Sequence, residues 1–225
     1  TKAFGSVSDD FILQLLESIG MPSWFQNTVR NLLTGVQLNV NQFGNFNLTI
    51  DVCRGVKQGC PLSPLLFDLV MDVLIHNLKK IPSAPDLVAY ADDLGIGTTD
   101  PSQYGDLAGV LHTFGRFSGL VTNTTKTKLL LAADDDHDYI RSFLLRTFWE
   151  KIPICQTGTY LGVMFGRKVD RIYTIYKVAF DKMQRRLKAL IAIRHNYTIH
   201  KRAIICNFFI FPIFSYLHNF FCIPK

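Results

Sequence analysis

The chain has 225 residues, of which 48% are hydrophobic and 19% are charged, and its formal net charge is +6. This composition excludes intrinsic disorder, and the length suffices for one large or two small domains. The five cysteines lack the paired spacing of a zinc site or a disulfide framework, which predicts an intracellular location, in the nucleus or the cytoplasm. The chain starts without Met in what looks like the middle of an element, so we interpret it as a fragment.

Two helices and a hairpin are predicted for the first fifty residues. Ser8 is placed to cap a helix that ends at Gly20, and a second helix follows from Pro22–Ser23 to Gly35. Alternating apolar residues over 36–52 then predict an antiparallel hairpin with one face buried.

A loop rich in glycine and proline separates this hairpin from the next helix. Gly55, Gly59 and Pro61 prevent a regular element until Ser63–Pro64, which resembles a cap with proline at the first helical position. We expect the helix to run from there to about Lys80.

The stretch VAYADDLGIG, residues 88–97, places Asp92 and Asp93 between two apolar runs. This pattern predicts a β-hairpin whose two-residue turn is the aspartate pair. Carboxylates held by rigid strands suit Mg²⁺, which takes one or two of them together with water and substrate phosphates. An exposed turn without a ligand is the alternative, because aspartate is favoured in turns for its local hydrogen bonds.

The second half of the chain is predicted to hold one more helix, two short strands and then mostly helix. Ser102 opens the helix and Gly119 closes it, while strands are expected at 128–132 and 160–165 and helix from about Ile172 onward. This order of elements indicates an α+β core of antiparallel sheet with packed helices, followed by a smaller helical and basic part.

Basic residues are concentrated in one tract of the chain. Eleven of the 24 Lys and Arg residues lie between Arg167 and Arg202, against two aspartates. Such an excess fits a polyanionic partner such as nucleic acid, with a solvated helix face as the alternative. Residues 203–224 carry no charge, which makes them a candidate membrane anchor, but Pro212 and several polar residues favour a buried, interrupted helix.

The segments RGVKQGCPLSPLLF and YADDL together resemble the reverse transcriptases of non-LTR, LINE-type retrotransposons. The flanks resemble the same family in the same order: KAFGSV its first catalytic motif, SGLVTNTTKTK its fourth, YLGVMFG its primer-gripping fifth, and HKRAIICNFFIFPIFSYL the start of the thumb. The resemblance covers nearly the whole chain. It implies a polymerase palm over 1–166 and the helical beginning of a thumb over 167–225.

The resemblance also implies roles for individual residues. Asp92 would be a ligand shared by two Mg²⁺ ions, with Asp93 beside it. Lys126 matches a lysine that would protonate the leaving pyrophosphate, with a solvated loop lysine as the alternative. Phe4 matches the aromatic gate under the incoming sugar, or else is a core residue. The dNTP would also contact Gln58 and Gly59.

Contacts to the RNA template and the DNA primer are expected from two groups of residues. Arg54 and Lys57 lie in the RGVKQG segment, where surface salt bridges are the alternative for both. The other group lies in the fifth motif and the basic tract and consists of Tyr160, Leu161, Gly162, Arg185, Arg186 and Lys188.

The chain departs from the family at its first motif. The first metal-binding aspartate would fall two positions before Thr1, and the second aspartate of that motif is Gly5 here. Asp9 and Asp10 do not replace it, because they lie at a helix start after the motif. We therefore expect RNA-directed DNA polymerisation in a longer parent and none in these 225 residues. A non-catalytic remnant that binds nucleic acid is the alternative; no membrane and no obligate protein partner are expected, although an anchor at 203–224 is kept as a third alternative.

Overall fold

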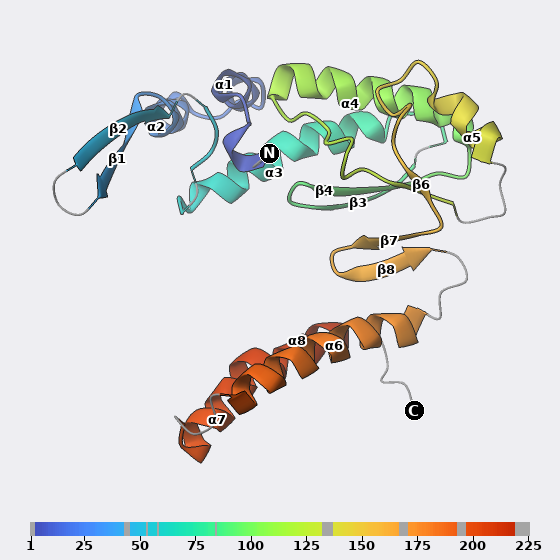
Figure 1. Ribbon diagram of the computed structural model, residues 1–225. Helices are drawn as coiled ribbons and strands as arrows, with labels where there is room; N and C mark the ends of the chain where they lie inside the picture. Colours follow the sequence, from blue (N-terminus) through green and yellow to red (C-terminus); the bar gives the residue numbers. More distant parts are fainter. Residues whose placement is uncertain are drawn as a thin grey trace. The chain divides into compact units, whose positions relative to one another are not determined.

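The protein is described by a computed structural model that covers residues 3–42, 46–52, 54–57, 59–83, 85–131, 137–166, 171–192 and 197–218 (Figure 1). It folds as two compact units, each with its own packing. The first consists of Thr1–Leu129 with Asp135–Pro153, and the second of Leu130–Asp134 with Ile154–Lys225.

The first unit begins with short helices whose ends follow local sequence signals. The Ser8 hydroxyl accepts the Phe11 N–H at 3.3 Å at the start of the first α-helix. The first two α-helices are followed by Gly20 and Gly35, which have positive φ values of 74° and 69°. These caps confirm the prediction for this region. The elements are a 3₁₀ turn at Ala3–Gly5, α1 at Asp9–Ser18, α2 at Ser23–Leu33, β1 at Val36–Gln42 and β2 at Phe46–Val52.

Strands β1 and β2 form the predicted antiparallel hairpin. Val36 pairs with Val52 and Leu38 with Ile50, so the alternating apolar positions share one face, as predicted. The prediction that this face is buried is wrong at Ile50, which is 45% exposed. No other strand pairs with the hairpin among the described residues. The alternation of apolar and polar residues thus predicts which residues share a face, but not whether another element packs on that face.

Helix α3, Leu62–Leu78, begins earlier than predicted. Pro61 takes the position before the helix, and Ser63 is 4% exposed inside the first turn. Its hydroxyl donates to the Lys57 carbonyl at 2.6 Å instead of capping the helix. The reason is a tight turn that precedes the helix, in which the Ser63 N–H donates to the Cys60 carbonyl at 3.1 Å.

The core of the first unit lies between α1, α3 and α4, Tyr104–Ser118, which pack against one another (Figure 1). The rings of Phe11 and Phe114 meet edge to face at 6.0 Å, and Phe67 is fully buried.

Asp100 rather than Ser102 caps the turn before α4, because its carboxylate accepts the Ser102 N–H at 2.9 Å. The remaining elements here are β3 at Asp86–Tyr90, β4 at Asp93–Gly97, the 3₁₀ turn Pro101–Gln103 and α5 at His137–Leu144.

The second unit contains a hairpin where a single strand is expected over 160–165. Leu161 and Gly162 have φ of 48° and 78° and form a two-residue turn, as in type I′ hairpins, so the chain reverses there. The other elements of the chain are β5 at Leu129–Leu130, β6 at Ile154–Cys155, β7 at Thr157–Tyr160, β8 at Val163–Gly166, α6 at Arg171–Ala192, α7 at Ile199–Ile205, a π-helical turn at Cys206–Ile210 and α8 at Pro212–His218.

The apolar C-terminal stretch is interrupted before Pro212, as predicted. The Phe211 N–H donates to the Cys206 carbonyl at 3.0 Å, five residues back, and proline then supplies no N–H to continue an α-helix. The expectation of burial is wrong at Phe208, which is 72% exposed. Within the described ranges, no helix has both the length and the apolar character to cross a bilayer.

The fold class is α+β, as the order of elements predicts. The single antiparallel sheet that was expected is absent from the described part of the chain, where strands pair only two by two: β1 with β2, β3 with β4, β5 with β6 and β7 with β8.

Ala179 is the buried centre of the second unit, with Val163, Met164, Tyr176, Ile213 and Phe214 packed around it.

Candidate active site

The aspartate pair lies at the closed end of the β3–β4 hairpin. The hairpin itself lies beside α3 in the first unit (Figure 1). Tyr90 pairs with Asp93, so the two-residue turn consists of Ala91 and Asp92. The prediction that both aspartates form the turn is therefore shifted by one residue, and Asp93 is the first residue of β4. Both aspartates are exposed, so their position is compatible with binding a cation from solvent.

The hairpin turn carries backbone strain next to Asp92. Ala91 has a φ of 49°, which side-chain-bearing residues rarely adopt and which costs on the order of 1–3 kcal/mol. The strain is tolerated because the ladder from Asp86 and Gly97 to Tyr90 and Asp93 fixes both strands. The two carboxylates are thus held on a rigid support, which is the first requirement for a metal site.

Phe4 is half buried and stacks on the core of the first unit. Its ring lies 4.4 Å from the ring of Phe67 in α3, with an angle of 12° between the planes. Its carbonyl accepts the Val56 N–H at 2.9 Å. The structure therefore brings Phe4 together with the RGVKQG loop, two segments that sequence reasoning assigned to the same dNTP.

The loop before α3 approaches the N-terminal segment very closely at Gly55. This glycine is buried with a φ of 94°, and a Cβ on it would lie 2.5 Å from the Gly5 Cα. Gly59, with a φ of 90°, is exposed and has open space where a Cβ would be. Backbone conformation alone thus requires glycine at 59, while both conformation and packing require it at 55.

Asp9 is a functional candidate that sequence reasoning missed. Its carboxylate accepts the Gly55 N–H at 3.0 Å, across 46 positions of sequence. Burial raises the pKa of Asp9, and the hydrogen bond from Gly55 opposes that rise, while the charge of Asp10 adds to it. Lys57 and Arg54 lower the pKa to a smaller extent. No local pattern signals this contact, because it depends on the tertiary position of the loop.

The two basic residues of the loop differ in their surroundings. The Lys57 ammonium donates to the Leu32 carbonyl near the end of α2, where a cation is favoured by the helix dipole. Arg54 is exposed. Gln58, the predicted sugar contact, lies outside the described residues. The predicted roles of Arg54 and Lys57 toward nucleic acid stay predictions.

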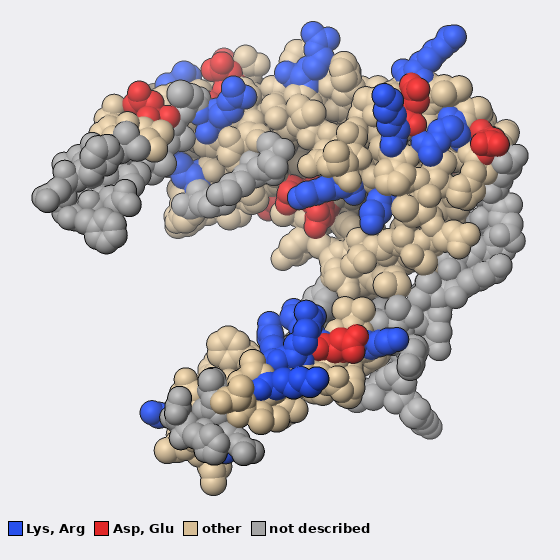
Figure 2. All heavy atoms as spheres, in the orientation of Figure 1, with Lys and Arg blue, Asp and Glu red and all other residues tan. Residues whose placement is uncertain are grey.

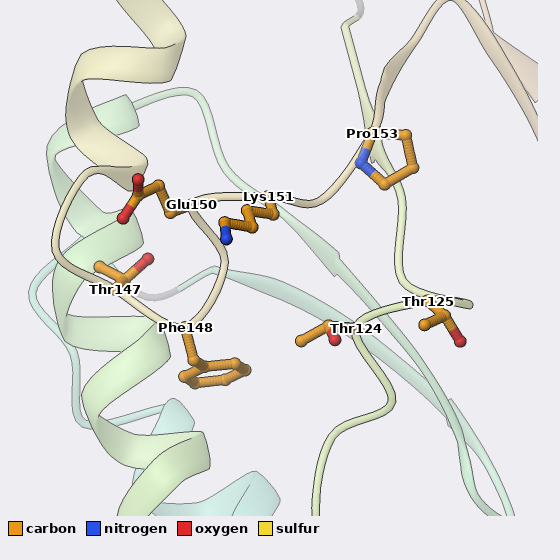
Figure 3. A pocket seen from close by; sticks show the side chains of 7 residues that line it. All are labelled: Thr124, Thr125, Thr147, Phe148, Glu150, Lys151 and Pro153. Atoms are coloured by element: carbon orange, nitrogen blue, oxygen red, sulfur yellow. The ribbon is translucent and has the colours of Figure 1, made fainter.

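Lys126 lies in an exposed turn ordered by Asn123. The Asn123 side-chain oxygen accepts the N–H groups of Thr125 at 3.1 Å and of Lys126 at 3.3 Å. A shallow pocket adjoins this turn, with Thr124 on one side and the residues that follow α5 on the other (Figure 3). It is lined by Thr124, Thr125, Thr147, Phe148, Glu150, Lys151 and Pro153, and contains neither Phe4 nor the aspartate pair.

The remaining predicted contacts belong to the second unit. Tyr160, Leu161 and Gly162 form the end of β7 and the turn to β8, and the rings of Tyr160 and Phe165 meet at 6.4 Å. Lys and Arg side chains gather over α6 (Figure 2), where the predicted contacts Arg185, Arg186 and Lys188 are all exposed. The Arg186 guanidinium also donates to the Phe209 carbonyl.

The aspartate pair fits one part of a Mg²⁺ site. Two carboxylates are hard oxygen ligands of the kind that Mg²⁺ binds together with water and phosphate. Among the residues described here, no cluster of three or more His, Cys, Asp or Glu side chains could hold a metal ion. Asp92 and Asp93 thus supply ligands from one hairpin, and the described chain does not place a third carboxylate beside them.

The sequence motifs and the hairpin-borne aspartate pair define a class of polymerase. A family model described as reverse transcriptase (RNA-dependent DNA polymerase) matches residues 1–165. The chain therefore belongs to the reverse transcriptase family.

Its relatives include Pol polyproteins of retrotransposable elements. The chain is 40% identical over 100 residues to the Pol polyprotein of the type-2 element R2DM of Drosophila melanogaster, covering 42% of this chain and 10% of that protein. It is 28% identical over 193 residues to the polyprotein of the type-1 element R2 of Popillia japonica, covering 79% and 27%. A protein of transposon TX1 of Xenopus laevis is 26% identical over 172 residues, covering 72% and 13%. The chain thus spans a minor part of each of these relatives.

Proposed function

We propose that this chain is part of an RNA-directed DNA polymerase of a non-LTR retrotransposon, which adds dNMP units to a primer 3′-hydroxyl on an RNA template. The observation that carries the proposal is the aspartate pair Asp92–Asp93 on a rigid hairpin, within a segment that matches the reverse transcriptase family. Residues 1–166 are the palm in this proposal, and 167–225 are the beginning of the thumb.

Asp92 and Asp93 are the proposed ligands of Mg²⁺, of which the complete enzyme would use two ions. Bound Mg²⁺ would supply stabilisation of the charge that develops on the transferred phosphoryl group. The hairpin contributes rigidity, because the Tyr90–Asp93 pair closes the strand ladder next to Asp92 and fixes the backbone that carries both carboxylates. Lys126 is the proposed proton donor to the leaving pyrophosphate, and its exposure in an ordered turn is compatible with reaching a bound ligand.

The proposed dNTP site is formed by Phe4, Gln58 and Gly59. Phe4 is held in place by stacking on Phe67 and by the hydrogen bond from the Val56 N–H to its carbonyl. A side chain that excludes a 2′-hydroxyl by its bulk must be held in this way. The proposed template and primer contacts are Arg54, Lys57, Tyr160, Leu161, Gly162, Arg185, Arg186 and Lys188.

A second candidate function is nucleic-acid binding without catalysis. It is favoured by α6, which carries six Lys and Arg residues and a single acidic residue, Asp181.

Primer extension separates the two candidates. The assay uses the protein expressed from the whole reading frame that encodes this chain, with a primed RNA template, dNTPs and Mg²⁺. Asp92→Asn is expected to lower the extension rate by at least about 10²-fold, since it removes part of a preorganised electrostatic site. Asp86→Asn, at the open end of the same hairpin, is the matched control and should retain the wild-type rate. Binding of the template without extension would favour the second candidate.

A further inference from the structure

The segment Ala3–Ser8 is fixed on both sides by backbone contacts. On one side, the Ser8 N–H donates to the Ser118 carbonyl at 2.7 Å, and a Cβ on Gly119 would collide with the Ser6 carbonyl oxygen. On the other side, the Val56 N–H donates to the Phe4 carbonyl at 2.9 Å. The end of α4 therefore supports this segment, and the segment in turn supports the loop before α3.

The loop has a side-chain anchor at its most constrained residue. Gly55 packs directly on Gly5, and its N–H donates to the Asp9 carboxylate at 3.0 Å. Asp9 is itself fixed as the first residue of α1, directly after the helix cap Ser8. Asp10, its neighbour in the same turn, is exposed.

We propose that Asp9 is a positioning residue, which holds the RGVKQG loop against the segment of Phe4 so that both sides of the dNTP site keep a fixed separation. This inference rests on the proposed function, because Phe4 and Gln58 are dNTP contacts only there. The carboxylate does not touch the nucleotide in this proposal, and it acts through the Gly55 N–H.

The physical reason is that two hydrogen bonds and one close contact define the loop start. Val56 binds the Phe4 carbonyl and Gly55 contacts Gly5, so removal of the Asp9 acceptor takes away one of the three contacts that hold the loop at Gly55 and Val56. A small displacement of a group that positions substrate weakens binding and turnover disproportionately. Asparagine keeps a side-chain oxygen acceptor at this position, whereas alanine removes it.

The first measurement is amide hydrogen exchange of the 225-residue chain, which does not depend on any ligand. Asp9→Ala is expected to speed exchange at Gly55 and Val56 by about tenfold or more relative to the wild type, because the local opening is no longer opposed. Asp9→Asn should retain most of the protection. Asp10→Ala is the matched control, because it removes a carboxylate from the same helical turn without touching the loop, and it should leave exchange at both amides unchanged.

The second measurement is binding of a fluorescent dNTP in the presence of Mg²⁺ and a primed RNA template. Asp9→Ala is expected to raise the nucleotide Kd about fivefold, while Asp9→Asn and Asp10→Ala stay within about twofold of the wild type. Rescue by asparagine distinguishes a positioning acceptor from a general requirement for charge.

Unchanged exchange at Gly55 in Asp9→Ala would overturn the proposal, as would faster exchange with an unaltered nucleotide Kd. A wild-type chain that binds no nucleotide would instead count against the proposed function. The exchange measurement would still decide whether Asp9 holds the loop, so the two failures are distinguishable.

Discussion

Tyr90 pairs with Asp93 across the β3–β4 hairpin, which leaves Ala91 and Asp92 to make the turn. The positive φ of 49° at Ala91 follows from this register, because the first central residue of such a tight turn adopts the left-handed region. The strain therefore lies directly beside the carboxylate that is the leading metal-ligand candidate.

The first prediction concerns this strained turn. Ala91→Gly relieves the strain of the left-handed backbone, but glycine also raises the conformational entropy of the unfolded chain. We therefore expect the free energy of unfolding to rise by between zero and about 1 kcal/mol. Ala91→Val should destabilise by about 1–2 kcal/mol or more, since a β-branched residue tolerates positive φ least. Urea unfolding measures both. Equal stability of the two variants would contradict the positive φ at this position.

A second prediction compares two glycines of one loop. Gly55→Ala places a Cβ 2.5 Å from the Gly5 Cα at a φ of 94°, so the backbone must move in addition to the strain of that φ. We expect it to lower the free energy of unfolding by about 3 kcal/mol or more. Gly59→Ala is the matched control: φ is 90° but the Cβ meets open space, so only the strain of about 1 kcal/mol applies. Comparable losses in both would show that Gly55 does not pack on Gly5.

The pKa of Asp9 leads to a third prediction, on pH dependence. Burial raises this pKa above the ordinary value of 3.8, so the folded state binds the proton more tightly than the unfolded chain does. The associated stability is fully present below 3.8 and is lost as the pH rises through the folded pKa. The wild type should therefore lose free energy of unfolding as the pH rises from 3.8 through the folded pKa, while Asp9→Asn should not. The difference in free energy of unfolding between Asp9→Asn and the wild type should thus shift in favour of the variant over this range.

An NMR titration of the Gly55 amide reports on the same group. Its shift should follow Asp9 protonation with a midpoint above 3.8, and Asp10→Asn should lower the midpoint because the charge of Asp10 raises the pKa of Asp9. A Gly55 shift that does not respond to pH in this range would argue against the hydrogen bond.

How far the sequence predicts this structure depends on the range of the interactions. Ser8 and Gly20 are correctly assigned because a cap and a left-handed terminus are local features. The aspartate turn is shifted by one residue because a two-residue turn at Ala91–Asp92 and one at Asp92–Asp93 both leave plausible apolar strands. Ile50 shows that alternation indicates a face without showing what covers it.

The candidate site shows the same limit. The motifs identify Asp92, Asp93 and Phe4 by type and order, and the structure adds that the Phe4 carbonyl binds the loop. The Asp9–Gly55 contact could not be predicted, because two residues separated by 46 positions meet only through the packing of α1 and the loop. Acidic residues at the start of a helix are explained locally by the helix dipole, which conceals such a second role.

The fourth prediction concerns salt and the basic helix α6. If Arg185 contacts a phosphate, Arg185→Ala should weaken binding of a primed RNA template and reduce the log–log salt slope by about 0.7–0.9. Lys79→Ala is the control, an exposed cation at the end of α3 outside the proposed contacts, and should leave the slope unchanged. A template affinity that is independent of salt would favour a solvated helix face.

The last prediction concerns catalysis by residues 1–225 alone. If Asp92 and Asp93, from one hairpin, are the only carboxylates that residues 1–225 offer to Mg²⁺, the ion is held incompletely. Loss of one element of a preorganised site typically costs about 10²–10³ in rate, so we expect no detectable extension of a primed RNA template.

A variant extended upstream to place an aspartate two positions before Thr1, and carrying Gly5→Asp, should gain activity. The first side-chain atom of the second change has room, since a Cβ on Gly5 meets nothing within 4 Å. Adding Asp92→Asn to that variant should abolish extension, with Asp86→Asn as the neutral control. Extension by residues 1–225 that persists in Asp92→Asn would refute the assignment of the hairpin carboxylates.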